Sequence, residues 1–297
     1  MANFIVNGLL KASQAILEWP SGRPDGELVD RIHPYRKMLP FMMRGRNESV
    51  VYYDDPCKAE NLLDYIARAK KAWGFEVDIT HCLVAACRVG LWENPKMNQF
   101  ISGRRLYART RQELTFSMKR QRMNKEAKLS AVKLNVDDRT ETFRQLCERI
   151  NGKIVTERSG DETYTDKELS IFTQLPRPLL ETALNVLRWA DSRNLVPGDF
   201  IKNDGFYTSI FIANLGSLGM NAGYHHLYEY GTCPLFMMVG KIDERAVVED
   251  GKIVARKILP IRWTYDERID DGLTSKYGMQ SCRNALENPE EAFGPID

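Results

Sequence analysis

Apolar residues recur at helical spacing in several segments of the chain. In segment 58–73, Leu62, Ile66 and Ala69 fall on one face and charged residues on the other, which is the pattern of an amphipathic helix. Segment 79–95 is more apolar, so we expect a buried helix that ends at its proline. The other predicted helices are an N-terminal one with Ile5, Leu9 and Ile16 on one face, 139–150, 175–194 and about 272–288.

Runs of β-branched and aromatic residues predict the strands. Segment 233–267 is expected to hold two strands around Asp250-Gly251, a pair typical of a type I′ hairpin turn. The other predicted strands are 48–54, 99–103, 105–110, 113–120, 130–136 and 207–216. Pro and Gly interrupt segment 19–27, which is typical of a linker or an extended arm. We therefore predict an α/β protein with an N-terminal helix and arm (1–31) and one domain (32–297).

The composition narrows the range of partners and compartments. The formal net charge is only +2 over 297 residues, which does not favour nucleic acid or a membrane as partner. The six cysteines form no Cys-x-x-Cys pair and no zinc-like cluster with histidine, so we expect buried thiols and no metal site. No apolar run is long enough to span a bilayer, and the first residues lack the features of a signal peptide. These features favour a cytoplasmic protein.

Three motifs occur in a specific order along the chain. The first is Phe-Ile-Ala-Asn-Leu-Gly-Ser-Leu-Gly at 211–219, the second is the hairpin that starts at 234, and the third is Asp-Glu-Arg-Ile-Asp-Asp-Gly at 266–272. Segment 36–53, with its Arg-Lys pair and strand, precedes them. Together they resemble the catalytic domain of 2-oxoacid dehydrogenase acyltransferases, the E2 components, within the chloramphenicol acetyltransferase-like superfamily. The resemblance covers about residues 32–297 and is weaker over 151–204.

The resemblance implies a fold, an assembly and a chemistry. The fold would be a mixed sheet flanked by helices, in a trimer with active sites between subunits. In this family, the His of Asp-His-Arg-x-x-Asp-Gly takes a thiol proton, and the Asp is mainly a structural anchor. A hydroxyl next to Asn-Leu-Gly stabilises the oxyanion. Nothing here resembles a lipoyl domain or a subunit-binding domain, so we expect a free-standing domain of the catalytic type.

Two residues depart from the family pattern at its chemical centre. Glu267 stands in the place of the histidine, and Ala213 stands in the place of a serine. A solvated glutamate is a weaker base than imidazole by about two pKa units, although burial can raise its pKa. Alanine cannot donate to an oxyanion, and losing one donor typically costs about 10²–10³ in rate. The predicted site residues are Glu267 and Asp271 as catalytic groups and Asn214, Arg268, His225 and His226 as substrate-binding groups.

Several alternatives stay open on the sequence alone. His225 and His226 could enter the channel as a base, although polar residues at a subunit contact are more common. The basic stretch 117–128, with Arg104 and Arg105 before it, could hold coenzyme A phosphates, although such a run is more often a solvated hairpin tip. We expect no bound cofactor and a coenzyme A thioester as substrate. The chain is either an acyltransferase with weak or altered chemistry or an inactive structural homotrimer, which could build a larger assembly.

Overall fold

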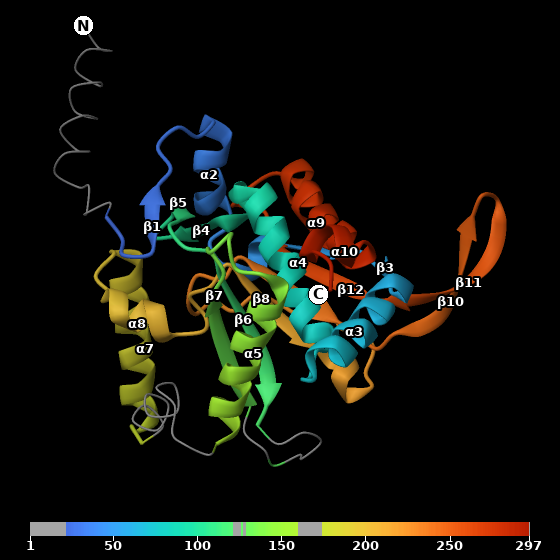
Figure 1. Cartoon of the computed structure of the whole chain (residues 1–297). Helices are drawn as coiled ribbons and strands as arrows, with labels where there is room; N and C mark the ends of the chain where they lie inside the picture. The colour runs from blue at the N-terminus through green and yellow to red at the C-terminus, as the bar shows by residue number, and fades with distance from the viewer. Residues whose placement is uncertain (1–21, 121–125, 127–128, 160–173, 297) are drawn as a thin grey trace, which may run out of the picture.

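The computed structural model describes residues 22–120, 126, 129–159 and 174–296 (Figure 1). The predicted N-terminal helix and most of the tip of the basic stretch 117–128 lie outside these residues. The strands are β1 (Gly26–Leu28), β2 (Val50–Asp54), β3 (Cys57–Lys58), β4 (Gln99–Ser102), β5 (Arg105–Arg109), β6 (Glu113–Lys119), β7 (Leu129–Asn135), β8 (Ile210–Asn214), β9 (Leu235–Val239), β10 (Asp243–Glu249), β11 (Lys252–Leu259) and β12 (Ile261–Asp266). The helices are α2 (Pro34–Met42), α3 (Glu60–Trp73), α4 (Ile79–Glu93), α5 (Phe143–Arg158), α7 (Arg177–Ser192), α8 (Gly198–Asn203), α9 (Gly272–Glu287) and α10 (Pro289–Phe293).

Six strands form the central sheet, in the order β2-β12-β9-β8-β6-β7. Strand β8 runs parallel to both of its neighbours, and the other pairs are antiparallel. The two strands predicted around Asp250-Gly251 are present as β10 and β11, but segment 233–267 also holds β9 and β12, which were not predicted. All five residues of β9 are buried. A strand buried on both faces lacks the apolar–polar alternation that reveals a strand in a sequence.

The sheet separates two apolar clusters because successive side chains of a strand point to opposite faces. In β8, Ile210 and Ile212 pack into the main core with residues of α3, α4, α5 and α9, whereas Phe211 and Ala213 pack on the opposite face. Figure 1 shows α3, α4, α5 and α9 gathered on one side of the sheet. The six cysteines are buried and free, as the sequence predicted.

The N-terminal arm is tied to the body of the protein. Strand β1 pairs with β5 in a small sheet with β4. Arg23 is buried and bonds to Asp25 and Asp191, and Arg109 also bonds to Asp25. The boundary between residues 31 and 32 stays a prediction, but residues 23–28 pack as part of the larger unit.

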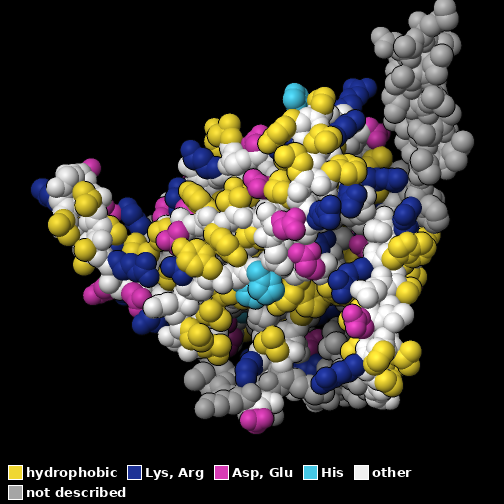
Figure 2. Space-filling view, turned by 180° about the vertical axis from the view of Figure 1, so that it is seen from behind, with side chains coloured by type: hydrophobic (Ala, Val, Ile, Leu, Met, Phe, Trp, Pro, Cys, Tyr) yellow, Lys and Arg dark blue, Asp and Glu magenta, His cyan; other side chains and the backbone are white. Residues whose placement is uncertain are grey.

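Strands β10 and β11 form a long hairpin that projects from the body (Figures 1 and 2). Its turn residues, Asp250 and Gly251, have φ angles of 49° and 75°. Positive φ at both central positions is what a type I′ turn requires, so the predicted turn is confirmed. At its base the hairpin pairs with β3, and its outer part exposes Val248 and Ile253.

Two helices differ from the prediction in extent. Helix α5 was expected to end at residue 150 but continues to Arg158. Ile150 is its last fully buried residue, and the added turns place only the partly buried Ile154 against the core, so the apolar pattern is weaker there. Helix α2 was expected only as an opening segment; it begins after His33, which caps it by accepting the backbone N–H of Tyr35.

Candidate active site

The chain turns sharply after β12, and a buried ion pair holds this turn. Arg268 donates from Nε to Asp266 Oδ1 (2.8 Å) and from Nη2 to Asp266 Oδ2 (2.7 Å). Both side chains are buried. Arg268 also donates to the backbone carbonyl of Met43 (3.0 Å), and Ser49 Oγ donates to Asp266 Oδ1 (2.9 Å). A bidentate pair with further partners at both ends fixes the geometry of the turn.

Arg268 therefore does not neutralise the neighbouring Glu267. Its guanidinium is held by Asp266 and by backbone carbonyls of the segment that follows α2. Its role in substrate binding stays a prediction.

Glu267 is presented to the surface by this fixed turn. Between Asp266 and Asp270 it is the only exposed residue. Its backbone N–H donates to the carbonyl of Ser49 (3.0 Å), which ties the turn to the start of β2. No ion pair to its carboxylate is found in the described part of the chain. Several buried bonds thus hold this turn rigid, and between Asp266 and Asp270 only the Glu267 carboxylate projects from it.

Asp271 begins the last long helix. It is the N-cap of α9, and its Oδ1 accepts the backbone N–H of Thr274 (2.9 Å). This bond lowers the pKa of the Asp271 carboxyl below its ordinary value. Arg36 lies on the same side: its Nη2 donates to the carbonyl of Arg268 (3.4 Å) and is 4.0 Å from Asp270. The position and bonds of Asp271 are those of an anchor, and a catalytic role stays a prediction.

We expect Asp271→Ala to lower the free energy of unfolding by about 1 kcal/mol, the usual effect of losing a helix N-cap. Because the folded pKa is depressed, the contribution is complete above the unfolded pKa of about 3.9 and is lost as the pH falls through the folded pKa. Urea unfolding of both proteins at pH 7 and at pH 3 measures this. Asp271→Asn keeps a capping oxygen and should stay close to wild type; an equal loss in both variants would contradict the capping role.

Ala213 and Asn214 end strand β8. The Ala213 methyl lies in the cluster opposite the helices, with Phe211, Phe236 and Met238. Asn214 uses its side chain locally: Oδ1 accepts the N–H of Ser217 (3.1 Å), and Nδ2 donates to Thr80 Oγ1 (3.2 Å). Asn214 therefore shapes the short helical turn Leu215–Leu218 that follows, and its predicted contact with substrate stays a prediction.

His225 and His226 lie in the loop that covers this face of the sheet. The His225 ring stacks on Phe236, with centroids 4.1 Å apart and planes 9° apart. Burial lowers the pKa of His225. Its Nδ1 lies 2.6 Å from the carbonyl of His226, which can only accept, so Nδ1 carries the proton in the neutral ring. Exposed histidine surface is visible near the middle of the face in Figure 2. The pair sits among aromatic side chains, and its role as a base stays a prediction.

Ser49 and Arg36 support the turn, and although both lie in segment 36–53, the sequence predicted no role at the site for either. Ser49 is 217 residues away from its partner Asp266 along the chain. Neither residue belongs to a motif with a spacing that points to residues 266–272, so only the tertiary structure could reveal them.

The described residues contain no group of three or more metal-ligating side chains. None of the helices in the described part of the chain combines the length and the apolar character of a membrane span.

The whole fold is shared with solved acyltransferases. A probable dihydrolipoamide acetyltransferase from Listeria monocytogenes matches with a TM-score of 0.59 at 15% identity, over 88% of this chain and 94% of that one. The cubic core of a pyruvate dehydrogenase multienzyme complex gives 0.58 at 16% identity, over 90% and 94% of the two chains. A chloramphenicol acetyltransferase gives 0.54 at 11% identity, over 88% and 99%.

Sequence comparison identifies the C-terminal part more narrowly. Residues 199–294 match the family "2-oxoacid dehydrogenases acyltransferase (catalytic domain)". This part of the chain is thus similar in sequence to the acyltransferase catalytic domain, and the chain as a whole has the fold of the solved acyltransferases. The predicted family and the predicted mixed sheet flanked by helices are confirmed.

Curated relatives of this acyltransferase-fold chain match only over a short segment. The acetyltransferase component of the pyruvate dehydrogenase complex of Bacillus subtilis is 35% identical over 52 residues, which is 18% of this chain and 12% of that protein. The succinyltransferase component of the 2-oxoglutarate dehydrogenase complex of Rickettsia typhi is 45% identical over 51 residues, 17% of this chain and 13% of that protein. The match thus spans about an eighth of the length of these relatives.

Proposed function

We propose that this protein binds an acyl thioester of coenzyme A or a related pantetheine thiol, at sites between the subunits of a homotrimer. The proposal rests mainly on Glu267, a lone exposed carboxylate on a turn fixed by buried bonds, at the position of the family's base. A rigid turn that presents one charged side chain to the outside supports a function for that side chain.

In the proposed reaction, the Glu267 carboxylate takes the proton from the attacking thiol. The sulfur then bonds to the thioester carbonyl carbon, the carbon–sulfur bond to the first thiol breaks, and the proton returns to the departing thiolate. A solvated glutamate with a pKa near 4.3 is poorly matched to a thiol with a pKa near 8.5. Enclosure by a neighbouring subunit would raise the glutamate pKa and improve the match. Ala213 supplies no oxyanion donor, so transfer should be slow.

A second candidate function is a structural subunit without chemistry. It is favoured by the neighbourhood of β8, where Ala213 packs among Phe211, Phe236 and Met238 and Asn214 is used in local bonds. One of the similar solved structures is a cubic core of a multienzyme complex, and in such a role this chain would contribute its fold rather than a reaction.

Calorimetry with acetyl-CoA separates the two candidates. We expect the wild-type protein to bind with a saturable isotherm and to transfer the acetyl group slowly to dihydrolipoamide. Glu267→Gln should keep binding and lose about 10²-fold in transfer rate, the lower end of the usual contribution of a general base. Glu244→Gln, at an exposed position of β10 in the projecting hairpin, is the matched control and should change neither quantity.

The double variant Ala213→Ser with Glu267→His restores the family pattern and should transfer faster than the wild type. If neither the wild type nor the double variant bound acetyl-CoA, the thioester-binding proposal would be excluded and the structural function would remain. Light scattering at micromolar concentration tests the trimer independently, and a stable monomer would remove the proposed site between subunits.

A further inference from the structure

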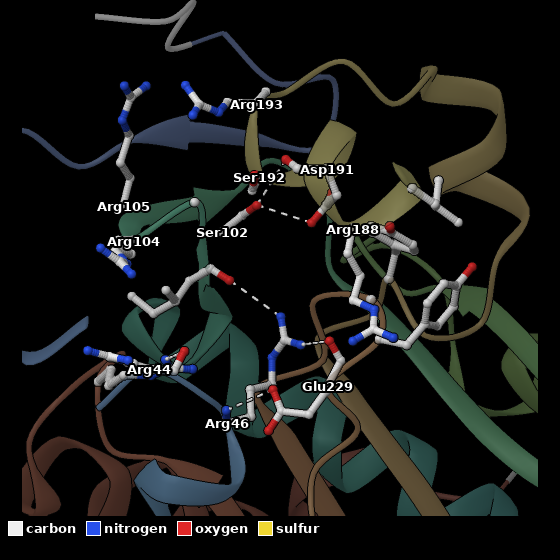
Figure 3. Close-up of a pocket in the computed structure, with 17 residues that line it drawn as sticks. Arg44, Arg46, Ser102, Arg104, Arg105, Arg188, Asp191, Ser192, Arg193 and Glu229 are labelled. Atoms are coloured by element: carbon white, nitrogen blue, oxygen red, sulfur yellow. Dashed lines mark hydrogen bonds between the residues drawn. The ribbon is translucent and has the colours of Figure 1, made fainter. Parts of the chain in front are cut away.

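A cavity of about 630 Å³ lies away from β8, beside the turn that joins β4 to β5 (Figure 3). The C-terminal end of α7 and the loop at residues 229–231 close its other sides. The lining includes two carboxylates, Asp191 and Glu229, and seven arginines: Arg44, Arg46, Arg104, Arg105, Arg188, Arg193 and Arg268. This is a strong excess of positive charge in one hollow of a chain whose net charge is close to zero.

Arg46 is the buried centre of this cavity. Its guanidinium donates to the carbonyls of Tyr228 (3.1 Å), Glu229 (3.1 Å) and Ile101 (3.4 Å). These bonds use three of its five N–H groups. In the described part of the chain no carboxylate forms an ion pair with this guanidinium, and burial lowers the pKa of Arg46. Asp266, Asp191 and Glu229 attract this charge without forming an ion pair with it. The guanidinium donates these hydrogen bonds to neutral carbonyls, so an anion that entered the cavity would stabilise the buried charge.

The two carboxylates of the lining already have other partners. Asp191 accepts from Arg23 Nη2 through Oδ1 (2.9 Å) and from Ser102 Oγ through Oδ2 (3.1 Å). Glu229 accepts the backbone N–H groups of Arg46 (3.1 Å) and Asn47 (3.0 Å). Figure 3 shows the Ser102–Asp191 and Arg46–Glu229 bonds on the wall of the cavity. These two acids therefore stabilise the walls of the cavity through bonds to Arg23, Ser102 and backbone N–H groups.

Three further arginines have no ion pair among the described residues: Arg44, Arg104 and Arg188. They come from three separate elements, namely the segment after α2, the β4–β5 turn and α7. Arg44 and Arg104 lie on one side of the cavity and Arg188 on the other, with Arg46 between them (Figure 3). Exposed arginines are common, but their convergence on one buried, unpaired arginine is the pattern of a site for an anion.

We propose that this cavity binds a small anion that carries a diphosphate group. Phosphate oxygens match the planar fork of a guanidinium, and two linked phosphates offer more such oxygens, over a longer span, than one phosphate does. The polar, basic lining does not suit an apolar ligand. Backbone carbonyls hold the buried Arg46 in place before any ligand arrives, which reduces the entropy lost on binding.

The diphosphate site is separate from the proposed thioester site. Glu267, Ala213 and Asn214 do not line the cavity. Arg268 does, but its side chain is bound to Asp266 and to the carbonyl of Met43. The diphosphate site therefore does not depend on the proposed acyl-transfer chemistry.

Calorimetric titration of the whole chain with inorganic pyrophosphate tests the site. We expect saturable binding of one pyrophosphate per chain and weaker binding of inorganic phosphate. The variant Arg44→Gln with Arg188→Gln should weaken pyrophosphate binding at least tenfold. The control, Arg144→Gln with Arg158→Gln on α5, removes the same charge from exposed positions outside the cavity and should stay within twofold of the wild type.

Thermal unfolding of each variant confirms that it is folded, since all four substituted arginines are exposed. Glu267→Gln should leave pyrophosphate binding unchanged, and the Arg44/Arg188 variant should leave acetyl-CoA binding unchanged. Absence of saturable pyrophosphate binding by the wild type, or an equal loss in the control, would overturn the site. Displacement of bound pyrophosphate by coenzyme A would overturn its separation from the thioester site.

Discussion

Replacing Arg268 with methionine should lower the free energy of unfolding by about 3–5 kcal/mol, the cost of leaving a buried charge without its partner. Asp266 has a relative exposure of 0%, and among the described residues it would keep only Ser49 Oγ and a backbone N–H as donors. The turn that carries Glu267 would lose its main restraint at the same time. Urea unfolding at pH 7 measures the loss.

The matched control is Arg144→Met. Arg144 pairs with Glu148 on the exposed face of α5, and exposed pairs of this kind contribute about 0.3–0.5 kcal/mol. The double variant Asp266→Asn with Arg268→Met removes both charges and should be more stable than Arg268→Met alone. If Arg268→Met unfolded at the same urea concentration as the Arg144 control, the ion pair would not be what holds the turn.

Gly216→Ala should be the most damaging change in the Asn-Leu-Gly segment, with a loss of about 3 kcal/mol, at the upper end for overpacking. An added Cβ would overlap the carbonyl oxygen of Gly240 and lie 2.8 Å from its carbon and 3.0 Å from Lys241 N. All three atoms are backbone, so no side chain can rotate away. The turn Leu215–Leu218 would have to move off the end of β9 and take the Asn214 bonds with it.

Gly223→Ala provides the control, because an added Cβ there meets no atom within 4 Å. Its urea midpoint should stay within experimental error of the wild type. Acetyl-CoA binding should weaken in Gly216→Ala and not in Gly223→Ala if Asn214 lies near the thioester. Equal stability of the two alanine variants would contradict the close contact between Gly216 and the backbone of Gly240.

The sequence by itself determined the elements whose signals are local. The spacing of apolar residues predicts helices α3 and α4. The Asp250-Gly251 pair predicts the hairpin because few residue pairs adopt two positive φ angles. The order of the three late motifs was enough to identify the fold. The same motifs predict that Glu267 and Ala213 stand where the family has its two chemical groups, and this assignment stays a prediction.

Only the tertiary structure decided which charges are partners. Next to Glu267 in the sequence, Arg268 could have neutralised it, but the fold turns that guanidinium toward Asp266 and the carbonyl of Met43. Ser49 joins the same cluster from 217 residues away. The arginine cavity collects residues from the segment after α2, the β4–β5 turn, α7 and the turn after β12, and no spacing in the chain links them. The apolar periodicity of a sequence indicates which face of a helix or strand is buried. Which charged side chains pair depends on which elements lie next to each other, and tertiary packing decides that.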